Sequence, residues 1–273
     1  MTHIITDSTS DLTLSQAEAL GVTMVSLKVV FSDGEYEDKR ELTNEQFYEK
    51  LKSSPVLPTT SLVNTAQFLD LFNAHPDEDL LVITISSALS GTYQSAMLAK
   101  EHLQRDNIYI VDSRSVSIGL SLLVEEAVRA RDAAIPAKEI QKMLEASAAH
   151  LRIMAIVDTL EYLVKGGRLS GFQGKVGSIL GIKPIVTVND GIVKNVAKAK
   201  GANAAVKQVA EYVQNSSNID PARPIRYAHA CNETGVALLM QKTGFGVWPV
   251  SVLGSVVGTH TGPGVVAIAY FEK

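Results

Sequence analysis

The sequence has one cysteine, Cys231, so no disulfide can form within the chain and a reducing compartment fits it. We interpret Cys231 as a buried structural thiol.

There is no run of about 18 apolar residues, so no membrane span is expected. The start, Met1 to Asp7, lacks the basic and apolar regions of a secretory signal. The net charge of −4 does not favour a nucleic-acid partner. These absences predict a soluble, cytoplasmic protein.

Motifs of the common catalytic classes are also absent. The sequence has no G-x-S-x-G elbow, no Walker loop and no G-x-G-x-x-G after a strand. The segment His229-Ala230-Cys231 lacks the further ligands of a zinc site, so no metal and no cofactor are expected. Four aspartates could be general bases, namely Asp7, Asp11, Asp112 and Asp158. Helix capping and turns explain them more simply.

The 273 residues suggest two domains, at about 150 residues each. In the first half, helical stripes alternate with apolar strand-like runs at His3–Thr6, Met24–Phe31, Leu80–Ile85 and Ile108–Val111. This alternation predicts a mostly parallel sheet flanked by helices. In the second half, Asn189-Asp190-Gly191 between two apolar runs predicts a β-hairpin. We therefore predict an α/β protein, with an α/β domain at 1–150 and a second, α+β domain at 151–273.

Hydroxyl-rich segments follow three of the predicted strands, at Asp7–Asp11, Ser86–Ser95 and Asp112–Ser117. Because the carboxyl ends of parallel strands meet at one edge of a sheet, we expect the segments to converge there. Ser86–Ser95 also leads from a strand into a helix. A helix start offers unpaired N–H groups and a positive dipole end, which together favour an anionic ligand.

Three further segments are candidates for a ligand site. Pro58-Thr59-Thr60-Ser61 has three hydroxyls that either cap a helix or bind a ligand. Lys165-Gly166-Gly167-Arg168 has glycines for an unusual backbone path, and its arginine can pair with a ligand, a partner or a carboxylate. Gly258–Gly264 is predicted to be a glycine-rich loop that presents His260, whose charge can be tuned.

In this order, the segments resemble the DegV family of bacterial fatty-acid-binding proteins. The matches span nearly the whole chain and are Thr6–Leu12, Pro58–Ser61, Ser86–Ser95, Asp112-Ser113, Lys165–Ser170, Ile182–Ile185, Asp190-Gly191 and Gly258–Gly264. The resemblance implies a carrier, not an enzyme, that buries one long-chain fatty acid between its two domains. It also implies a partner, a fatty acid kinase that converts the bound carboxylate to an acyl phosphate.

The family's carboxylate ligands fall by motif on Thr60, Ser90 and His260. Backbone amides near Gly91 can add donors, and the expected supporting residues are Ser61, Ser87, Thr92 and Arg168. Members that work with the kinase tend to carry arginine where this chain has Lys200, so Lys200 is the expected partner contact. The chain also departs from the family pattern after Ser61, where Leu62-Val63 replaces Gln-Pro.

Two other functions stay open beside the lipid carrier. A hydrolase of acyl esters would use Ser90 as nucleophile and His260 as base, and it needs the two within about 3.2 Å of each other. A binder of a small phosphorylated metabolite would normally use arginines, which are few in the hydroxyl-rich segments. In a carrier, donors must replace the water lost by the carboxylate, and each buried CH₂ adds about 0.8 kcal/mol.

Overall fold

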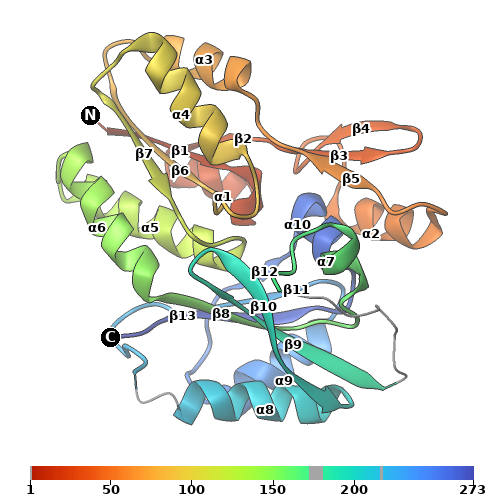
Figure 1. Ribbon diagram of the computed structural model, residues 1–273. Helices are drawn as coiled ribbons and strands as arrows, with labels where there is room; N and C mark the ends of the chain where they lie inside the picture. Colours follow the sequence, from red (N-terminus) through yellow and green to blue (C-terminus); the bar gives the residue numbers. More distant parts are fainter. Residues whose placement is uncertain (1, 172–180, 216–217) are drawn as a thin grey trace.

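The computed structural model describes residues 2–171, 181–215 and 218–273 and contains three sheets (Figure 1). The first is parallel, in the order β2 (Val22–Val25), β1 (Thr2–Asp7), β6 (Asp79–Thr84) and β7 (Ile108–Asp112). The second is in the order β10 (Ile192–Lys200), β9 (Ile182–Asn189), β8 (Leu151–Ile156), β13 (Val266–Phe271), β11 (Arg226–His229) and β12 (Val250–Val252). The third is antiparallel, in the order β4 (Gly34–Glu37), β3 (Lys28–Phe31) and β5 (Thr59–Ser61). In the second sheet β11 and β12 run parallel and the other neighbours antiparallel.

Helices cover both faces of the two larger sheets. Their bounds are α1 (Leu14–Ala19), α2 (Asn44–Ser53), α3 (Thr65–Asn73), α4 (Thr92–Leu103), α5 (Ile118–Asp132), α6 (Ala137–His150), α7 (Glu161–Lys165), α8 (Ala202–Asn215), α9 (Glu233–Thr243) and α10 (Ser255–Thr261). Figure 1 shows α5 and α6 between the parallel sheet and the six-stranded sheet, with α3 and α4 above and α8 and α9 below. The predicted α/β architecture, with a parallel sheet flanked by helices and a second sheet-rich half, is confirmed.

The apolar core lies in two clusters. The larger one surrounds the parallel sheet and continues through α5 to one face of the six-stranded sheet, where it includes Ala267 and Phe271. The smaller one fills the space between the other face of that sheet and helices α8 and α9. The predicted boundary at residue 150 falls between α6 and β8, and the larger cluster crosses it. The division into two domains stays a prediction.

Local sequence signals set several element ends. Thr13, Thr43 and Asn64 each accept a hydrogen bond from a backbone N–H in the first turn of the helix that follows, and the Gln three residues later completes a capping box. The hairpin predicted at Asn189-Asp190-Gly191 joins β9 and β10, with both Asp190 and Gly191 at positive φ. The capping residues therefore mark where these three helices begin, and the Asn-Asp-Gly turn marks where β9 ends and β10 begins.

Three sequence predictions were wrong. Met24–Phe31 is not one strand, because Leu27 donates its N–H to Ser8 Oγ (3.1 Å) and the chain passes from β2 in one sheet to β3 in another. Gly258–Gly264 is not a loop throughout, since α10 extends to Thr261. Cys231 is exposed and has a positive φ in the turn after β11, so it is not a buried thiol.

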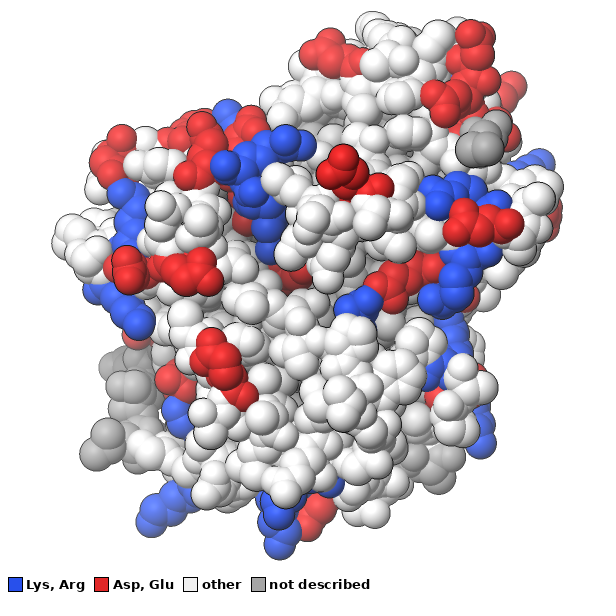
Figure 2. Space-filling view, turned by 180° about the vertical axis from the view of Figure 1, so that it is seen from behind, with Lys and Arg blue, Asp and Glu red and all other residues white. Residues whose placement is uncertain are grey.

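Charged side chains are mixed in sign over the face that Figure 2 shows, where lysines and arginines alternate with acidic groups in its upper half. Lys194, Lys198 and Lys200 lie exposed along β10. None of the helices in the described ranges has both the length and the apolar composition that a bilayer crossing requires.

Candidate functional site

The three hydroxyl-rich segments meet at the carboxyl edge of the parallel sheet, as predicted. Ile85 donates its N–H to Asp7 Oδ2 (2.7 Å), which joins the segments after β1 and β6. Backbone hydrogen bonds from Ser86 to Ser115 (2.8 Å) and from Ser117 to Thr9 (2.7 Å) complete the connection. Parallel strand ends therefore produce one polar edge from residues that are far apart in sequence.

The candidate aspartates act as caps and ion-pair partners. Asp7 caps the short 3₁₀ helix Ser8–Ser10, and complete burial raises its pKa to about 6. Asp112 accepts from the backbone N–H groups of Ser87 and Arg114. Asp158 pairs with Lys183, and Asp11 pairs with Lys39. These contacts agree with the structural interpretation made from the sequence.

His260 lies in the last turn of α10 and contacts the candidate hydroxyl on β5. Its Nε2 atom is 2.8 Å from Thr60 Oγ1. Burial, together with the positive charge of Arg168, lowers the pKa of His260 to about 4. The ring is therefore neutral at neutral pH, and its buried Nδ1 has no hydrogen-bond partner among the described residues. A neutral imidazole and a hydroxyl thus form an uncharged polar pair.

Arg168 supplies the positive charge beside this pair. Its guanidinium donates to the backbone oxygens of Leu89 (3.1 Å) and Gly166 (2.5 Å), which fixes its direction. Gly166 itself faces the histidine, since a Cβ on it would lie 2.3 Å from His260 Nδ1. Gly166 is needed here for close approach, whereas Gly167 has a φ of 70° and provides the unusual backbone path predicted for this segment.

Two cavities meet at Thr60, Arg168 and His260. The outer one is open, has a volume of about 610 Å³ and is also lined by the Ser54–Thr59 segment, Tyr162 and Lys165. The inner one, about 60 Å³ between the described residues, is mostly apolar. Its walls come from the segments that follow β6 and β7, from β10 and from α7 and α10, and include Ile85, Leu89, Val116, Leu163, Val193, Val256 and Val257. A polar pair at the neck between an open vestibule of mixed polarity and an apolar interior suits an amphipathic ligand.

The other predicted site residues lie outside the lining of these two cavities. Ser90 Oγ is 3.0 Å from Thr92 Oγ1 and accepts from Thr92 N–H, so it caps the start of α4. Ser87 bonds to Asp112, and Ser61 is exposed at the end of β5. Gly91 lies under Leu62, and Lys200 is exposed at the end of β10. Among the described residues of the Ser86–Ser95 segment, Leu89 is the one that lines the inner cavity.

Sequence reasoning missed the apolar lining residues. Leu163 belongs to the short helical stripe after residue 160, and Val256 and Val257 lie about one helical turn before His260. Such residues look like ordinary core. The sequence signal that could identify them is that they lie close to the motifs that contain His260 and Arg168.

The sequence predicts no metal site. In the described ranges, one cluster, His3, His75 and Glu78, has ligand atoms within 4.8 Å of one another. The two imidazole rings are stacked, 4.1 Å apart at an angle of 25°, so their in-plane lone pairs do not converge on one ion. His75 Nδ1 lies 2.7 Å from Glu78 Oε1, and a hydrogen-bonded pair explains the cluster.

The hydrolase needs a hydrogen bond between Ser90 and His260, but His260 pairs with Thr60 and Ser90 with Thr92. A pKa of about 4 also makes His260 a weak base at neutral pH. Among the described residues, no acidic group bonds to Nδ1 of His260 as the orienting carboxylate does in a catalytic triad. The arrangement suits binding better than acyl transfer.

Comparison with known proteins gives a match over the whole chain. The family model described as "Uncharacterised protein, DegV family" matches residues 1–273. A DegV domain-containing protein of Clostridium perfringens is 33% identical over 280 residues, which cover 98% of this chain and 96% of that protein. A solved DegV family protein from Thermus thermophilus, described as binding fatty acid, has 30% identity and a TM-score of 0.89 over 100% of this chain and 99% of its own. DegV from Bacillus subtilis, described as a fatty acid binding protein, has 29% identity and a TM-score of 0.85 over the same shares.

Proposed function

The chain belongs to the DegV family, and from this premise we propose that it binds one long-chain fatty acid between its two halves. The carboxylate lies at Thr60, His260 and Arg168, and the acyl chain extends into the inner cavity. The observation that carries the proposal is the contact between Thr60 Oγ1 and His260 Nε2 at the neck of the two cavities.

The protonation of the neutral pair determines what it offers to a carboxylate. With its proton on Nε2, His260 donates to Thr60 Oγ1, and the Thr60 hydroxyl hydrogen is then free to point at the ligand. Arg168 adds a positive charge beside this hydroxyl. A hydrogen bond between the ionised carboxylate and such a donor is about twice as strong as one between neutral groups. These groups replace water around the carboxylate, whose burial is otherwise very costly.

The acyl chain supplies most of the affinity, at about 0.8 kcal/mol for each buried CH₂. The inner cavity of about 60 Å³ has to widen as a long chain enters, because its apolar walls are in close contact. Because the walls come from both halves of the molecule, a small movement of one half relative to the other would widen the cavity.

Ser90 and Gly91 contribute from the start of α4 in the same proposal. The positive end of that helix and the Gly91 N–H attract the carboxylate, and Ser90 gives up its bond to Thr92 to reach it. Thr92 keeps the turn in place by accepting from Val63 N–H. Ser61 and Ser87 have supporting roles at the rim.

The proposal includes a partner, a fatty acid kinase that phosphorylates the carboxylate through the open outer cavity. Lys200 is the proposed contact, although lysine lacks the planar fork of arginine. Lys200→Glu should reduce acyl-phosphate formation by purified kinase with ATP, whereas Lys194→Glu on the same strand should not. Such a carrier works in the cytoplasm.

Native mass spectrometry tests the binding. The protein should carry a long-chain fatty acid after expression and should rebind palmitate at one per chain after delipidation. Release of free acid from acyl esters, abolished by Ser90→Ala, would instead favour the hydrolase. Failure to bind palmitate would overturn the proposal.

A further inference from the structure

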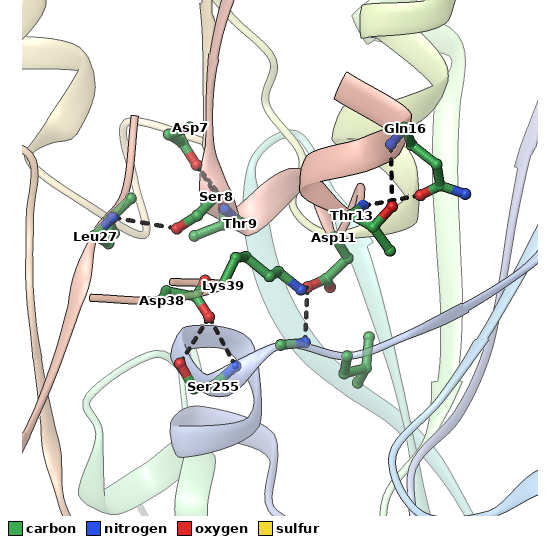
Figure 3. A network of polar contacts seen from close by, with 12 residues as sticks. Asp7, Ser8, Thr9, Asp11, Thr13, Gln16, Leu27, Asp38, Lys39 and Ser255 are labelled. Atoms are coloured by element: carbon green, nitrogen blue, oxygen red, sulfur yellow. Dashed lines mark hydrogen bonds and ion pairs between the residues drawn. The ribbon is translucent and has the colours of Figure 1, made fainter. Parts of the chain in front are cut away.

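A buried cluster of charged groups lies outside both cavities (Figure 3). Asp11 and Asp38 are 3% and 1% exposed, and the side chain of Lys39 is 9% exposed. Lys39 Nζ is 3.0 Å from Asp11 Oδ1. Two carboxylates and one ammonium are expensive to bury, so the cluster must be compensated by other contacts.

The compensation comes from the start of α10. Gly254, at the N-cap, donates its N–H to Asp11 Oδ1 (2.8 Å) and has no side chain to cap the helix itself. Ser255 donates both its N–H (3.0 Å) and its hydroxyl (2.6 Å) to Asp38 Oδ1. Two carboxylates from the N-terminal half thus cap α10, at the end where its dipole favours negative charge.

The other end of α10 carries His260. The helix has seven residues, a length of about 10 Å, so a shift at Ser255 is transmitted to His260. Close packing keeps it rigid: a Cβ on Gly258 would lie 2.6 Å from the Phe47 ring and 2.7 Å from the Tyr48 hydroxyl. Tyr48 also donates its hydroxyl to Leu253 O (3.1 Å).

Both ends of α10 are fixed to one small sheet. Thr60 is on β5, and Asp38 follows β4 directly, with its N–H bonded to Leu27 O (2.9 Å). The strands β4 and β5 both pair with β3. The distance between Asp38 and Thr60 is therefore set by a hydrogen-bonded ladder, and α10 spans it with Ser255 at one end and His260 at the other.

We propose that Asp38 is a positioning residue for the carboxylate site: by holding Ser255, it sets where His260 meets Thr60. Asp11, which is paired with Lys39, holds the preceding residue, Gly254, in the same way. The inference rests on the proposed function, since it concerns the affinity of that site. Asp38 itself touches neither cavity lining and binds no ligand.

A double-mutant cycle tests the inference with palmitate as the probe. Asp38→Asn should raise Kd about tenfold in the natural background, because small displacements of a binding group are costly. In a His260→Ala background the same change should have no further effect, since the group that Asp38 positions is gone. Additive effects in the two backgrounds would overturn the inference, and so would an unchanged Kd.

A second readout is independent of affinity. When α10 loosens, the His260 ring gains water, and its pKa, measured by NMR on labelled imidazole, should rise from about 4 towards 6.5. Asp33→Asn is the control. Asp33 lies in the turn between β3 and β4, close in sequence to Asp38, but it is exposed and pairs with Lys50 of α2. If Asp38→Asn does not fold, Ser255→Ala removes only the hydroxyl donor and should give a smaller shift in the same direction. An unshifted pKa in a folded variant would contradict the inference, whereas loss of palmitate binding by the natural protein would contradict the proposed function.

Discussion

The Nε2 atom of His260 lies 2.8 Å from Oγ1 of Thr60, although 200 residues separate the two in sequence. The contact joins β5 of the small sheet to the last turn of α10. Around it stand one arginine and two cavities of different polarity.

Thr60→Val keeps the shape of the side chain and removes the hydroxyl. Because a buried donor to a carboxylate is lost, we expect Kd for palmitate to rise about tenfold. Titration calorimetry of delipidated protein measures it. Thr65→Val, at the first position of α3 and outside the lining of both cavities, should leave Kd unchanged. Equal effects of the two changes would remove Thr60 from the site.

Arg168→Met removes the charge beside the neutral pair while keeping an apolar stem. Kd for palmitate should rise, and the remaining binding should depend less on salt concentration, because a charge-assisted hydrogen bond is lost. The exposed Arg129 on α5 provides the matched control, Arg129→Met. A salt dependence that Arg168→Met leaves intact would assign the charge to another residue.

The titration of His260 should make the protein less stable in acid. Its pKa is about 4 in the folded chain and about 6.5 when unfolded, so the unfolded chain binds more protons between these values. Stability should therefore fall as pH drops from 6.5 to 4, by at most about 3 kcal/mol. Chemical denaturation of delipidated protein at several pH values measures this loss.

His260→Gln is the comparison for that titration, since glutamine keeps a hydrogen-bonding group and does not titrate. The stability difference between the two proteins should narrow with falling pH. Asp7 acts in the opposite sense, because its raised pKa makes the folded chain gain stability as pH falls below about 6. Both proteins contain Asp7, so its contribution cancels. A difference that stays constant with pH would show that His260 is not buried.

Gly166→Ala should displace His260. The new Cβ would lie 2.3 Å from Nδ1 and 2.9 Å from the backbone oxygen of Tyr162, and the second atom cannot rotate away. We expect weaker palmitate binding and a lower Tm. Gly91→Ala is the control for stability alone: its Cβ would meet only the tip of the exposed Leu62 side chain, so the Tm should change little. Tolerance of Gly166→Ala would mean that α7 and α10 are less closely packed.

The sequence predicts those parts of the fold whose cause is local. Thr43 and Gln46 form their capping box, and Asn189-Asp190-Gly191 forms its hairpin, because each depends on neighbours in the chain. The single strand expected over Met24–Phe31 failed because its break is caused by Ser8, which lies in another element. The helix at Ser255–Thr261 was hidden for a similar reason, since its cap is supplied by Asp11 and Asp38.

The candidate site shows the same division. Family resemblance pointed to Thr60 and His260, and the structure brings them into contact. It also pointed to Ser90, whose hydroxyl is instead engaged by Thr92 in the described arrangement. The sequence leaves a ligand, a partner and a carboxylate open as the contact of Arg168, because a lone arginine in a glycine turn has many ordinary explanations. Its position between the two cavities depends on how α7 packs, and no motif encodes that.

The small sheet that holds β5 has a consequence for how the protein is made. Thr60 emerges early in translation, but its partner is not synthesised until residue 260, and α10 can dock only after that. A nascent chain therefore passes through most of its synthesis without a complete neck. Under the proposed function, an acyl chain can be captured only after the late helix has packed, so its capture would report that folding has reached its final stage.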